Sequence, residues 1–326
     1  MIVGFLLAAY SVVANDSIQT LGTFLSSNAH RPWWLLWIFG SGILVVVILY
    51  SWYVNGGDPA YGRLQKFPVP EGGVSWLHAI PPLALLILTR LGVPVSTTFL
   101  VLTVFAVTGG EPGNLGAMLN KSALGYVVAF AAAIILFLLV FRRLTEYFHR
   151  TRGTTVPNYW VVLQWASTGF LWSQWLIQDL ANIFVYLPRD LSVNWLLFGI
   201  VALVAMKGYI FYQFGGEIQK IVTSKTDTTD VRAATVIDFI YGMVLLAFKE
   251  NIFGIPAFEN MPMSTTWVFL GVLAGREFAL SVYLADTSAK GTARKVVSDA
   301  LKALSGLVVS VLLAFGLPWL YEVAFS

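Results

Sequence analysis

The sequence of 326 residues predicts an all-α polytopic membrane protein. Hydrophobic residues make up 57% of the chain and charged residues only 11%, against about 25% charged residues in a typical soluble domain. The mean hydropathy is +0.75, and the apolar segments are long and continuous. A soluble fold could not cover so much apolar surface with so few charges, and a transmembrane β-barrel would show short alternating strands instead.

Several classes of protein are excluded by residues that are missing or widely spaced. The chain contains no cysteine, which excludes disulfides, iron–sulfur clusters and thiol catalysis. His30, His78 and His149 are too far apart in sequence to suggest a zinc site. No P-loop, G-x-S-x-G or H-E-x-x-H motif is present, so we expect neither an enzyme nor a bound cofactor. Basic cytoplasmic loops explain the net charge of +3, so we expect no nucleic-acid partner.

The first third of the chain alternates a broken apolar segment with a continuous one. Residues 2–27 are apolar but are interrupted by polar residues, among them Asn15, Asp16 and Gln19. Residues 33–53 carry no charge and are long enough to cross about 30 Å of hydrocarbon. We therefore expect a broken helix followed by a full membrane span.

Residues 75–107 predict a re-entrant hairpin. They hold two apolar runs separated by Gly92-Val93-Pro94, and the second run is too short to span a membrane comfortably. Two short helices that meet at a Gly/Pro tip enter and leave on one side. A second continuous span follows at residues 122–141.

The second half of the chain repeats this order. Residues 159–187 are apolar but interrupted, residues 195–214 form a span, and residues 233–285 form a second hairpin with short helices around Gly254, Pro256 and Pro262. A last span lies between residue 296 and the C-terminus. We therefore predict repeat 1 at residues 1–145, a basic cytoplasmic linker at 146–157 and repeat 2 at 158–326.

Three motifs recur in the same order and at nearly equal spacing in the two halves. Asn15-Asp16-x-x-Gln19 matches Gln178-Asp179-x-x-Asn182, and residues 53–57 match residues 212–216. The third pair is Pro-x-Ser-Thr-Thr, at residues 94–98 and again at residues 262–266. Three ordered matches indicate an internal duplication, whereas one Pro-x-Ser-Thr-Thr alone would indicate no more than a helix start.

The number of crossings predicts that the two copies have opposite orientations. Repeat 1 crosses the membrane three times, an odd number, so repeat 2 starts from the other side and the repeat is inverted. Loop 142–157 carries four arginines, so we expect it on the cytoplasmic side of the cell (inner) membrane. Both termini are then outside, together with Arg63, Lys66, Lys121 and Arg189.

Asp16 and Asp179 are the carboxylates most typical of an ion site. A carboxylate inside a membrane segment costs about 2.5–3.5 kcal/mol on insertion scales. One such residue could be a buried hydrogen-bonding group, but two at matching repeat positions, each flanked by amides in a broken helix, favour cation binding. We predict that Na⁺ binds at Asp16 and Asp179, with further ligands among Asn15, Gln19, Gln178 and Asn182.

The two Ser-Thr-Thr runs predict an anion site. Each run opens a helix, where a hydroxyl can simply cap the free N–H groups. The same N–H groups and the positive end of the helix dipole also bind anions. Two such starts at the tips of inverted hairpins would face each other near the middle of the membrane. The predicted ligands are Ser96, Thr97, Thr98, Ser264, Thr265 and Thr266, with Arg90 as an additional cation near the first tip.

Other charges in the apolar segments receive no assigned role. Lys249, Glu250, Glu259 and Arg276 belong to the second hairpin, where each could pair internally. Asp238 could be a structural carboxylate or part of a proton path.

The motifs resemble those of the inorganic phosphate transporter family, whose members carry two inverted repeats. Ala14-Asn15-Asp16 and Pro94-Val95-Ser96-Thr97-Thr98 are similar to the family's signature in the first copy, and residues 262–266 are similar to it in the second. Phe99 and Trp267 stand where the family has histidine. The resemblance implies a distant member with sodium- or proton-coupled uptake, an elevator-like or rocking motion, and often a homodimer.

The predicted function is therefore Na⁺-coupled symport of inorganic phosphate or a similar small oxyanion across the lipid bilayer. One alternative is H⁺-coupled transport of another anion, such as sulfate. A second is a passive anion channel on the same fold, and a third is a membrane sensor that binds the ligand without transporting it.

Overall fold

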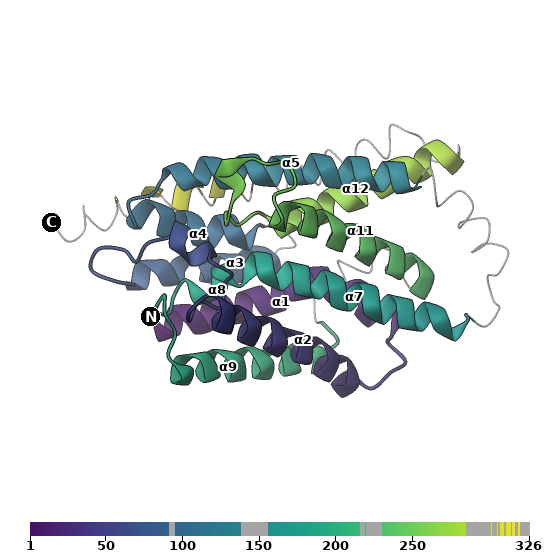
Figure 1. Ribbon diagram of the computed structural model, residues 1–326, viewed down its shortest axis with the longest axis horizontal. Coiled ribbons are helices and arrows are strands. Elements are labelled where there is room, and N and C mark those ends of the chain that lie inside the picture. Colours follow the sequence, from purple (N-terminus) through teal and green to yellow (C-terminus); the bar gives the residue numbers. More distant parts are fainter. Residues whose placement is uncertain are drawn as a thin grey trace.

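The computed structural model describes residues 1–90, 95–137, 156–215, 219 and 230–284, together with short pieces between residues 301 and 319. Within these residues the regular structure consists of α-helices and short 3-10 turns, without a β-strand (Figure 1). The helices run mostly along the long axis of the molecule. The predicted all-α class is confirmed.

The first two helices follow the predicted segments closely. Helix α1 spans Ile2–Ser27 and bends by 57° between residues 18 and 20, within one turn after Asp16. Near this bend the hydroxyl of Thr20 donates a hydrogen bond to the main-chain oxygen of Asp16 at 3.0 Å, a bond of the kind that often bends helices. Helix α2 spans Trp33–Val54.

The first hairpin consists of two short helices, as predicted. After the turns η1 (Arg63–Lys66) and η2 (Trp76–Ala79), α3 spans Ile80–Arg90 and α4 spans Thr97–Thr108. Helix α5 then spans Gly113–Leu136 and so begins earlier than the predicted span at residue 122. The additional N-terminal part of α5 carries Asn114, which donates to the main-chain oxygen of Lys66, and Lys121, which donates to that of Phe258.

The second half follows the predicted order of segments, with longer helices than predicted in its second hairpin. Helix α7 (Asn158–Asp179) ends at the predicted aspartate and is followed, after Leu180, by the short α8 (Ala181–Phe184). Helix α9 spans Val193–Tyr212, α11 spans Val231–Lys249, and α12 spans Thr265–Leu284 after the η4 turn (Pro256–Phe258).

The prediction of short helices for the second hairpin is therefore wrong. Helices α11 and α12 contain 19 and 20 residues. The polar residue Asp238 does not interrupt α11, because both of its carboxylate oxygens accept hydrogen bonds from threonines on α1 and α7.

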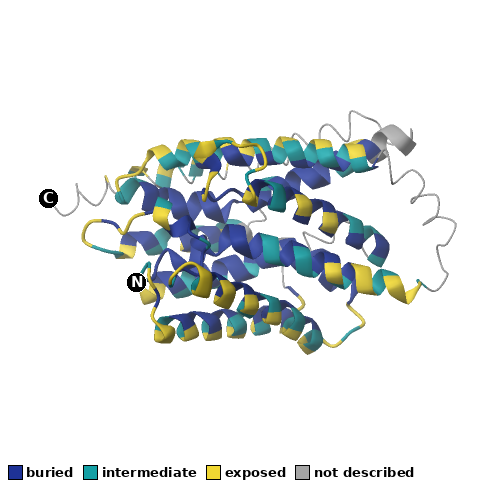
Figure 2. Cartoon of the chain, viewed as in Figure 1, coloured by how far each residue is buried: buried dark blue, intermediate teal, exposed yellow. Residues whose placement is uncertain are grey.

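The described helices form a multi-pass membrane protein. Helices α2, α5, α9 and α11 are each long and apolar enough to cross a membrane, and the two bent parts of α1 together make a fifth candidate. Exposed positions lie along the outer sides of α2 and α9 (Figure 2), and many are apolar, such as Val46 and Val201 with exposed fractions of 66%. Apolar outer faces of this kind suit contact with lipid.

Contacts between helices occur in matched pairs. Helix α1 packs on α3 and α9, while α7 packs on α11 and α2. Helices α2 and α9 also pack on each other, and α5 packs along α12. In Figure 1, α3 and α4 lie toward the end of the molecule where the N-terminus lies, and α11 and α12 extend toward the other end. A duplicated plan gives such pairs, and the inverted orientation of repeats 1–145 and 158–326 stays a prediction.

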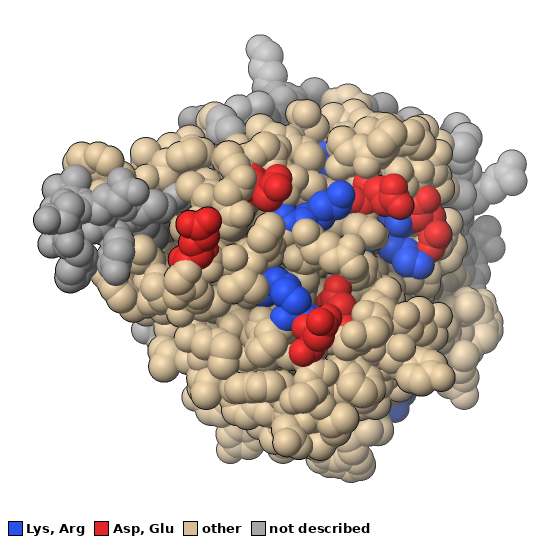
Figure 3. Space-filling model, turned by 60° about the vertical axis from the view of Figure 1, so that its left-hand side comes forward, with Lys and Arg blue, Asp and Glu red and all other residues tan. Residues whose placement is uncertain are grey.

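Charged side chains gather at the end of the molecule that holds the N-terminus. Figure 3 shows this end, where acidic and basic side chains lie close to one another within a mostly uncharged surface. Most of the predicted linker 146–157 and its arginines lie outside the described residues. The predicted orientation in the membrane therefore stays a prediction.

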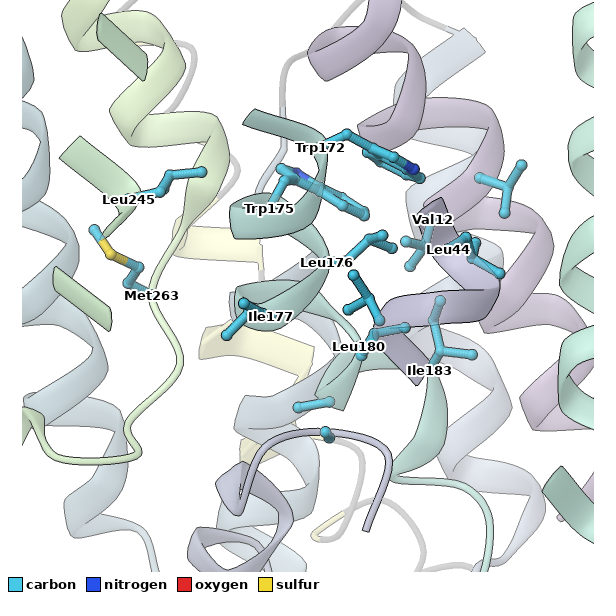
Figure 4. Close-up of a cluster of buried hydrophobic side chains, with 14 of the residues drawn as sticks. Val12, Leu44, Trp172, Trp175, Leu176, Ile177, Leu180, Ile183, Leu245 and Met263 are labelled. Atoms are coloured by element: carbon cyan, nitrogen blue, oxygen red, sulfur yellow. The ribbon is translucent and has the colours of Figure 1, made fainter. Parts of the chain in front are cut away.

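The apolar core surrounds the junction between α7 and α8. The rings of Trp172 and Trp175 stack with centroids 4.9 Å apart, and Leu176 and Leu180 continue the same buried surface toward Val12 of α1 (Figure 4). The indole N–H of Trp172 also donates to the main-chain oxygen of Gly40 on α2 at 2.8 Å. This packing fixes the end of α7 and therefore the position of its last residue, Asp179.

Candidate functional site

The two predicted aspartates lie close together inside the helical bundle. Asp16 and Asp179 have exposed fractions of 2% and 1%, and their carboxylates repel each other electrostatically. Asp16 lies within one helical turn before the bend of α1, and Asp179 is the last residue of α7. Each carboxylate therefore lies where a helix is irregular, as the sequence predicts.

Asp179 is contacted by residues from both halves of the chain. Its Oδ1 atom accepts a hydrogen bond from the Asn182 amide at 2.6 Å and another from the Thr98 hydroxyl at 3.1 Å. The hydroxyl of Thr265 also interacts with this carboxylate. Because Thr98 belongs to α4 and Thr265 to α12, the starts of both helices meet at one aspartate.

Asp16 has fewer partners. Its Oδ1 atom accepts a hydrogen bond from the Asn15 amide at 2.6 Å, and the hydroxyl of Thr97 faces the same carboxylate. The side chain of Gln19, the third residue of the predicted motif, lies outside the described residues.

Among the described residues, four buried oxygen atoms in this cluster have no hydrogen-bond partner. They are Asp16 Oδ2, Asp179 Oδ2, Asn182 Oδ1 and Thr97 Oγ1. Leaving such atoms unpaired is costly. Carboxylate, amide and hydroxyl oxygens are the ligands that hard cations such as Na⁺ take. Among the described residues no three His, Cys, Asp or Glu side chains cluster as in a transition-metal site.

The two predicted serines cap the starts of α4 and α12. The amide of Phe99 donates to Ser96 Oγ at 3.3 Å, and the amide of Trp267 donates to Ser264 Oγ at 3.2 Å. In addition, the Ser122 hydroxyl on α5 accepts a hydrogen bond from the amide of Ser264 at 2.8 Å. Capping, the simpler alternative considered for these hydroxyls, therefore operates at both helix starts.

The starts of α4 and α12 also contact each other. The Thr98 hydroxyl, which donates to Asp179, also lies 3.3 Å from the main-chain oxygen of Met263. The rings of Phe99 and Trp267, which occupy equivalent repeat positions, have centroids 5.6 Å apart. All six predicted hydroxyl residues are buried: Ser96, Thr97, Thr98, Ser264, Thr265 and Thr266. Two helix N-termini, each the positive end of a helix dipole, thus meet beside the two aspartates.

Three residues of the cluster were not predicted. Tyr241 on α11 is 2% exposed and donates its hydroxyl to the main-chain oxygen of Thr265 at 3.0 Å. Arg63 Nη2 donates to Gln178 Oε1 at 3.2 Å. Lys121 Nζ donates to the main-chain oxygens of residues 258 and 261, at 2.9 and 2.6 Å, just before the start of α12. No repeated motif includes these residues, so the sequence offered no signal for them.

The remaining predicted charges lie apart from this cluster or outside the described side chains. The side chain of Arg90 is not described. Lys249 pairs with its neighbour Glu250, and Arg276 lies 3.6 Å from Glu277. Glu259 lies on the exposed surface.

Asp238 is buried and fully hydrogen-bonded. Its two carboxylate oxygens accept hydrogen bonds from Thr23 at 2.8 Å and from Thr168 at 2.5 Å. These bonds tie α11 to α1 and α7.

One solved structure places this arrangement among known folds. No protein-family model matches the sequence, and no curated protein matches it. A structure described as "The sodium-dependent phosphate transporter" is similar with a TM-score of 0.60 and 16% sequence identity, over 99% of this chain and 98% of that chain. The chain shares the fold of that transporter. The resemblance predicted from the motifs is confirmed for the fold, and the low identity fits a distant relation.

Proposed function

We propose that this protein is a secondary active transporter that couples Na⁺ to the uptake of inorganic phosphate or a similar small oxyanion. The observation that carries the proposal is the meeting of two buried aspartates with two helix N-termini, through Thr98 and Thr265 at Asp179 and Thr97 at Asp16. The name of the structurally similar protein, a sodium-dependent phosphate transporter, supports the same choice of ions.

In this proposal Na⁺ binds to the aspartates. Asp16 and Asp179 supply the negative charge, and the amide side chains of Asn15, Gln19, Gln178 and Asn182 supply further oxygens. The unpaired buried oxygens Asp16 Oδ2 and Asp179 Oδ2 support this assignment, because Na⁺ would give each of them a partner.

The anion binds at the helix starts, next to the cations. Free N–H groups and the positive dipole ends of α4 and α12 attract it, and the hydroxyls of residues 96–98 and 264–266 contact it. The aspartates alone would repel an anion at this distance, and Na⁺ removes that repulsion. Because the same threonines border both ions, binding of one ion favours binding of the other, which is the coupling that symport requires.

The proposal also includes the inverted arrangement of repeats 1–145 and 158–326. A site formed where inverted repeats meet is typical of secondary transporters, which expose it to each side of the membrane in turn. Outward-facing termini in the cell membrane and a homodimer, implied by the family resemblance, belong to the same proposal.

The test is uptake of labelled phosphate by proteoliposomes containing the full-length protein. We expect phosphate to accumulate above its external concentration when Na⁺ is high outside, and not when choline replaces Na⁺. Accumulation driven by a pH gradient alone, or of sulfate instead of phosphate, would favour the H⁺-coupled alternative. Equilibration without accumulation would indicate a channel, and binding without flux would indicate a sensor.

A further inference from the structure

Arg63 is a buried arginine in a loop that the sequence places at the membrane surface. Its exposed fraction is 3%, although it lies in the η1 turn after α2. The turn is closed by Asp58, whose carboxylate accepts hydrogen bonds from the amides of Ala60 at 2.6 Å and Gly62 at 2.9 Å. Gly62 has a φ of +74°, which favours glycine. The loop therefore folds back and carries the guanidinium into the protein.

The guanidinium points at the candidate site. Its Nη2 atom donates to Gln178 Oε1 at 3.2 Å, and Gln178 directly precedes Asp179. Arg63 is attracted electrostatically to both Asp179 and Asp58. Its Nε atom is buried and has no hydrogen-bond partner in the part of the chain that the structure describes. A buried guanidinium with an unpaired donor is costly, and an additional acceptor at this position would relieve that cost.

The charge of Arg63 persists at neutral pH. Burial lowers its pKa to about 10, and the carboxylates of Asp179 and Asp58 oppose that shift. Lys121, which is also buried, lies close enough to interact with Arg63 electrostatically. Arg63 therefore supplies a buried positive charge beside Asp179, and Lys121 lies near Arg63. When Na⁺ neutralises the aspartates, the positive charge on this side is no longer balanced, and a bound anion would restore the balance.

We propose that Arg63 is a substrate-binding residue that contacts the transported oxyanion. The inference rests on the proposed function, and it assigns to Arg63 the selection of the class of anion. A planar guanidinium binds two oxygens of one oxyanion side by side, so the site favours phosphate or sulfate over a halide. The anion then lies between Arg63 and the starts of α4 and α12.

Arg189 offers a matched control at the same end of the molecule. In the described part of the chain, the hydrogen bonds of its guanidinium all go to main-chain oxygens. It donates to Phe67 at 3.1 and 2.7 Å, to Val185 at 2.8 Å and to Leu187 at 3.2 Å. It therefore holds two loops together. Arg189→Gln removes a part-buried arginine but leaves Arg63, which faces Asp179, in place.

The experiment measures binding of inorganic phosphate and of sodium sulfate to the purified full-length protein in Na⁺ buffer, by calorimetry. We expect Arg63→Gln to weaken phosphate binding at least about tenfold, the loss expected for a charge-assisted hydrogen-bonding group. Arg189→Gln should lower the melting temperature and leave the phosphate Kd within about twofold. Na⁺ binding without phosphate, read as a shift of the melting temperature, should be as tight in Arg63→Gln as in the wild type, or tighter.

If Arg63→Gln does not fold, Arg63→Lys tests whether Arg63 binds the anion. Lysine keeps the charge but not the paired contact, so phosphate binding should weaken about threefold or more. Wild-type phosphate affinity in a folded Arg63 variant overturns the assignment, and so does an equal loss of Na⁺ and phosphate binding, which marks a structural role.

The two proposals fail in different ways. If the wild type and Arg63→Gln bind phosphate equally well, only the proposed role of the arginine is overturned. Wild-type protein that binds sulfate but not phosphate overturns the choice of substrate, and the arginine is then judged on sulfate by the same comparison. Wild-type protein that binds neither anion in Na⁺ overturns both proposals.

Discussion

Asp16 and Asp179 occupy equivalent positions in the two copies of one motif, but their surroundings differ. Asp179 interacts with Asn182, Thr98 and Thr265, and Arg63 attracts it. Asp16 interacts with Asn15 and Thr97, and the interactions found for its carboxylate include no cation. Among the described residues, then, one copy of the motif has an internal positive charge beside it and the other does not.

Under the proposed function, this difference predicts that the two aspartates have different roles. A buried carboxylate without a nearby cation must be neutralised by a bound cation or by a proton, since an unpaired charge in a membrane interior is costly. A carboxylate beside an arginine is partly balanced already. We therefore expect Asp16 to govern the requirement for Na⁺, and Asp179 to link the Na⁺ and anion positions.

The largest expected effect comes from Asp16→Asn. Removing the less balanced carboxylate should reduce Na⁺-driven phosphate uptake into proteoliposomes at least about 100-fold, the equivalent of roughly 3 kcal/mol. Asp238→Asn is the control, because Asp238 is a buried carboxylate whose two oxygens are already hydrogen-bonded; its uptake should keep the Na⁺ dependence of the wild type. Asp16→Asn protein with unchanged uptake would remove the basis of the comparison.

Asp179→Asn should have a smaller and different effect. The Na⁺ concentration for half-maximal uptake should rise about tenfold, while KM for phosphate at saturating Na⁺ should stay constant or fall. The fall is expected because Arg63 would no longer share its charge with a carboxylate. Identical Na⁺ and phosphate curves for Asp16→Asn and Asp179→Asn would show that the two aspartates are equivalent.

Thr98→Val tests the contact between the two halves. The Thr98 hydroxyl donates to Asp179 and lies within hydrogen-bonding distance of the Met263 main-chain oxygen, so valine should reduce uptake about fivefold, as loss of about 1 kcal/mol predicts. Thr103→Val on the same helix is the control, since the buried Thr103 hydroxyl has no hydrogen-bond partner and should tolerate the change. Equal uptake by the two variants would argue against a bridging role for Thr98.

The smallest effects are expected from the two caps. Ser96→Ala should lower the free energy of unfolding by about 1 kcal/mol. Ser264→Ala should lower it less, because the Ser122 hydroxyl still binds the amide of residue 264. Denaturant or thermal unfolding of the purified variants measures both values. A larger loss for Ser264→Ala would mean that the bond to Ser122 does not support the start of α12.

Much of the fold could be predicted from the sequence because membrane helices have a local signature. Residues 33–53 and 195–214 are uninterrupted or nearly so, and the structure has α2 and α9 there. The second hairpin was predicted less well, since Asp238 looks like an interruption until its partners on other helices are known.

The residues of the candidate site also fall into those that the sequence could predict and those that it could not. The duplicated motifs predicted Asp16, Asp179, Asn182 and the threonines as candidates, because their residue types recur at matching positions, and the structure brings these residues together. Arg63 and Lys121 were assigned to the outer surface, because a basic residue next to a span is usually solvated. Their burial depends on loops that fold back onto the helices, and no local pattern records this.

The sequence by itself determined that the chain is a helical membrane protein with two polar motifs, each present twice, because hydropathy, helix starts and duplication are properties of short segments. Only the tertiary structure decided that the two threonine-led helix starts meet at one pair of aspartates, and that a buried arginine stands beside Asp179. Long-range packing sets those distances, and the strength of an electrostatic interaction depends on distance in space rather than on separation along the chain.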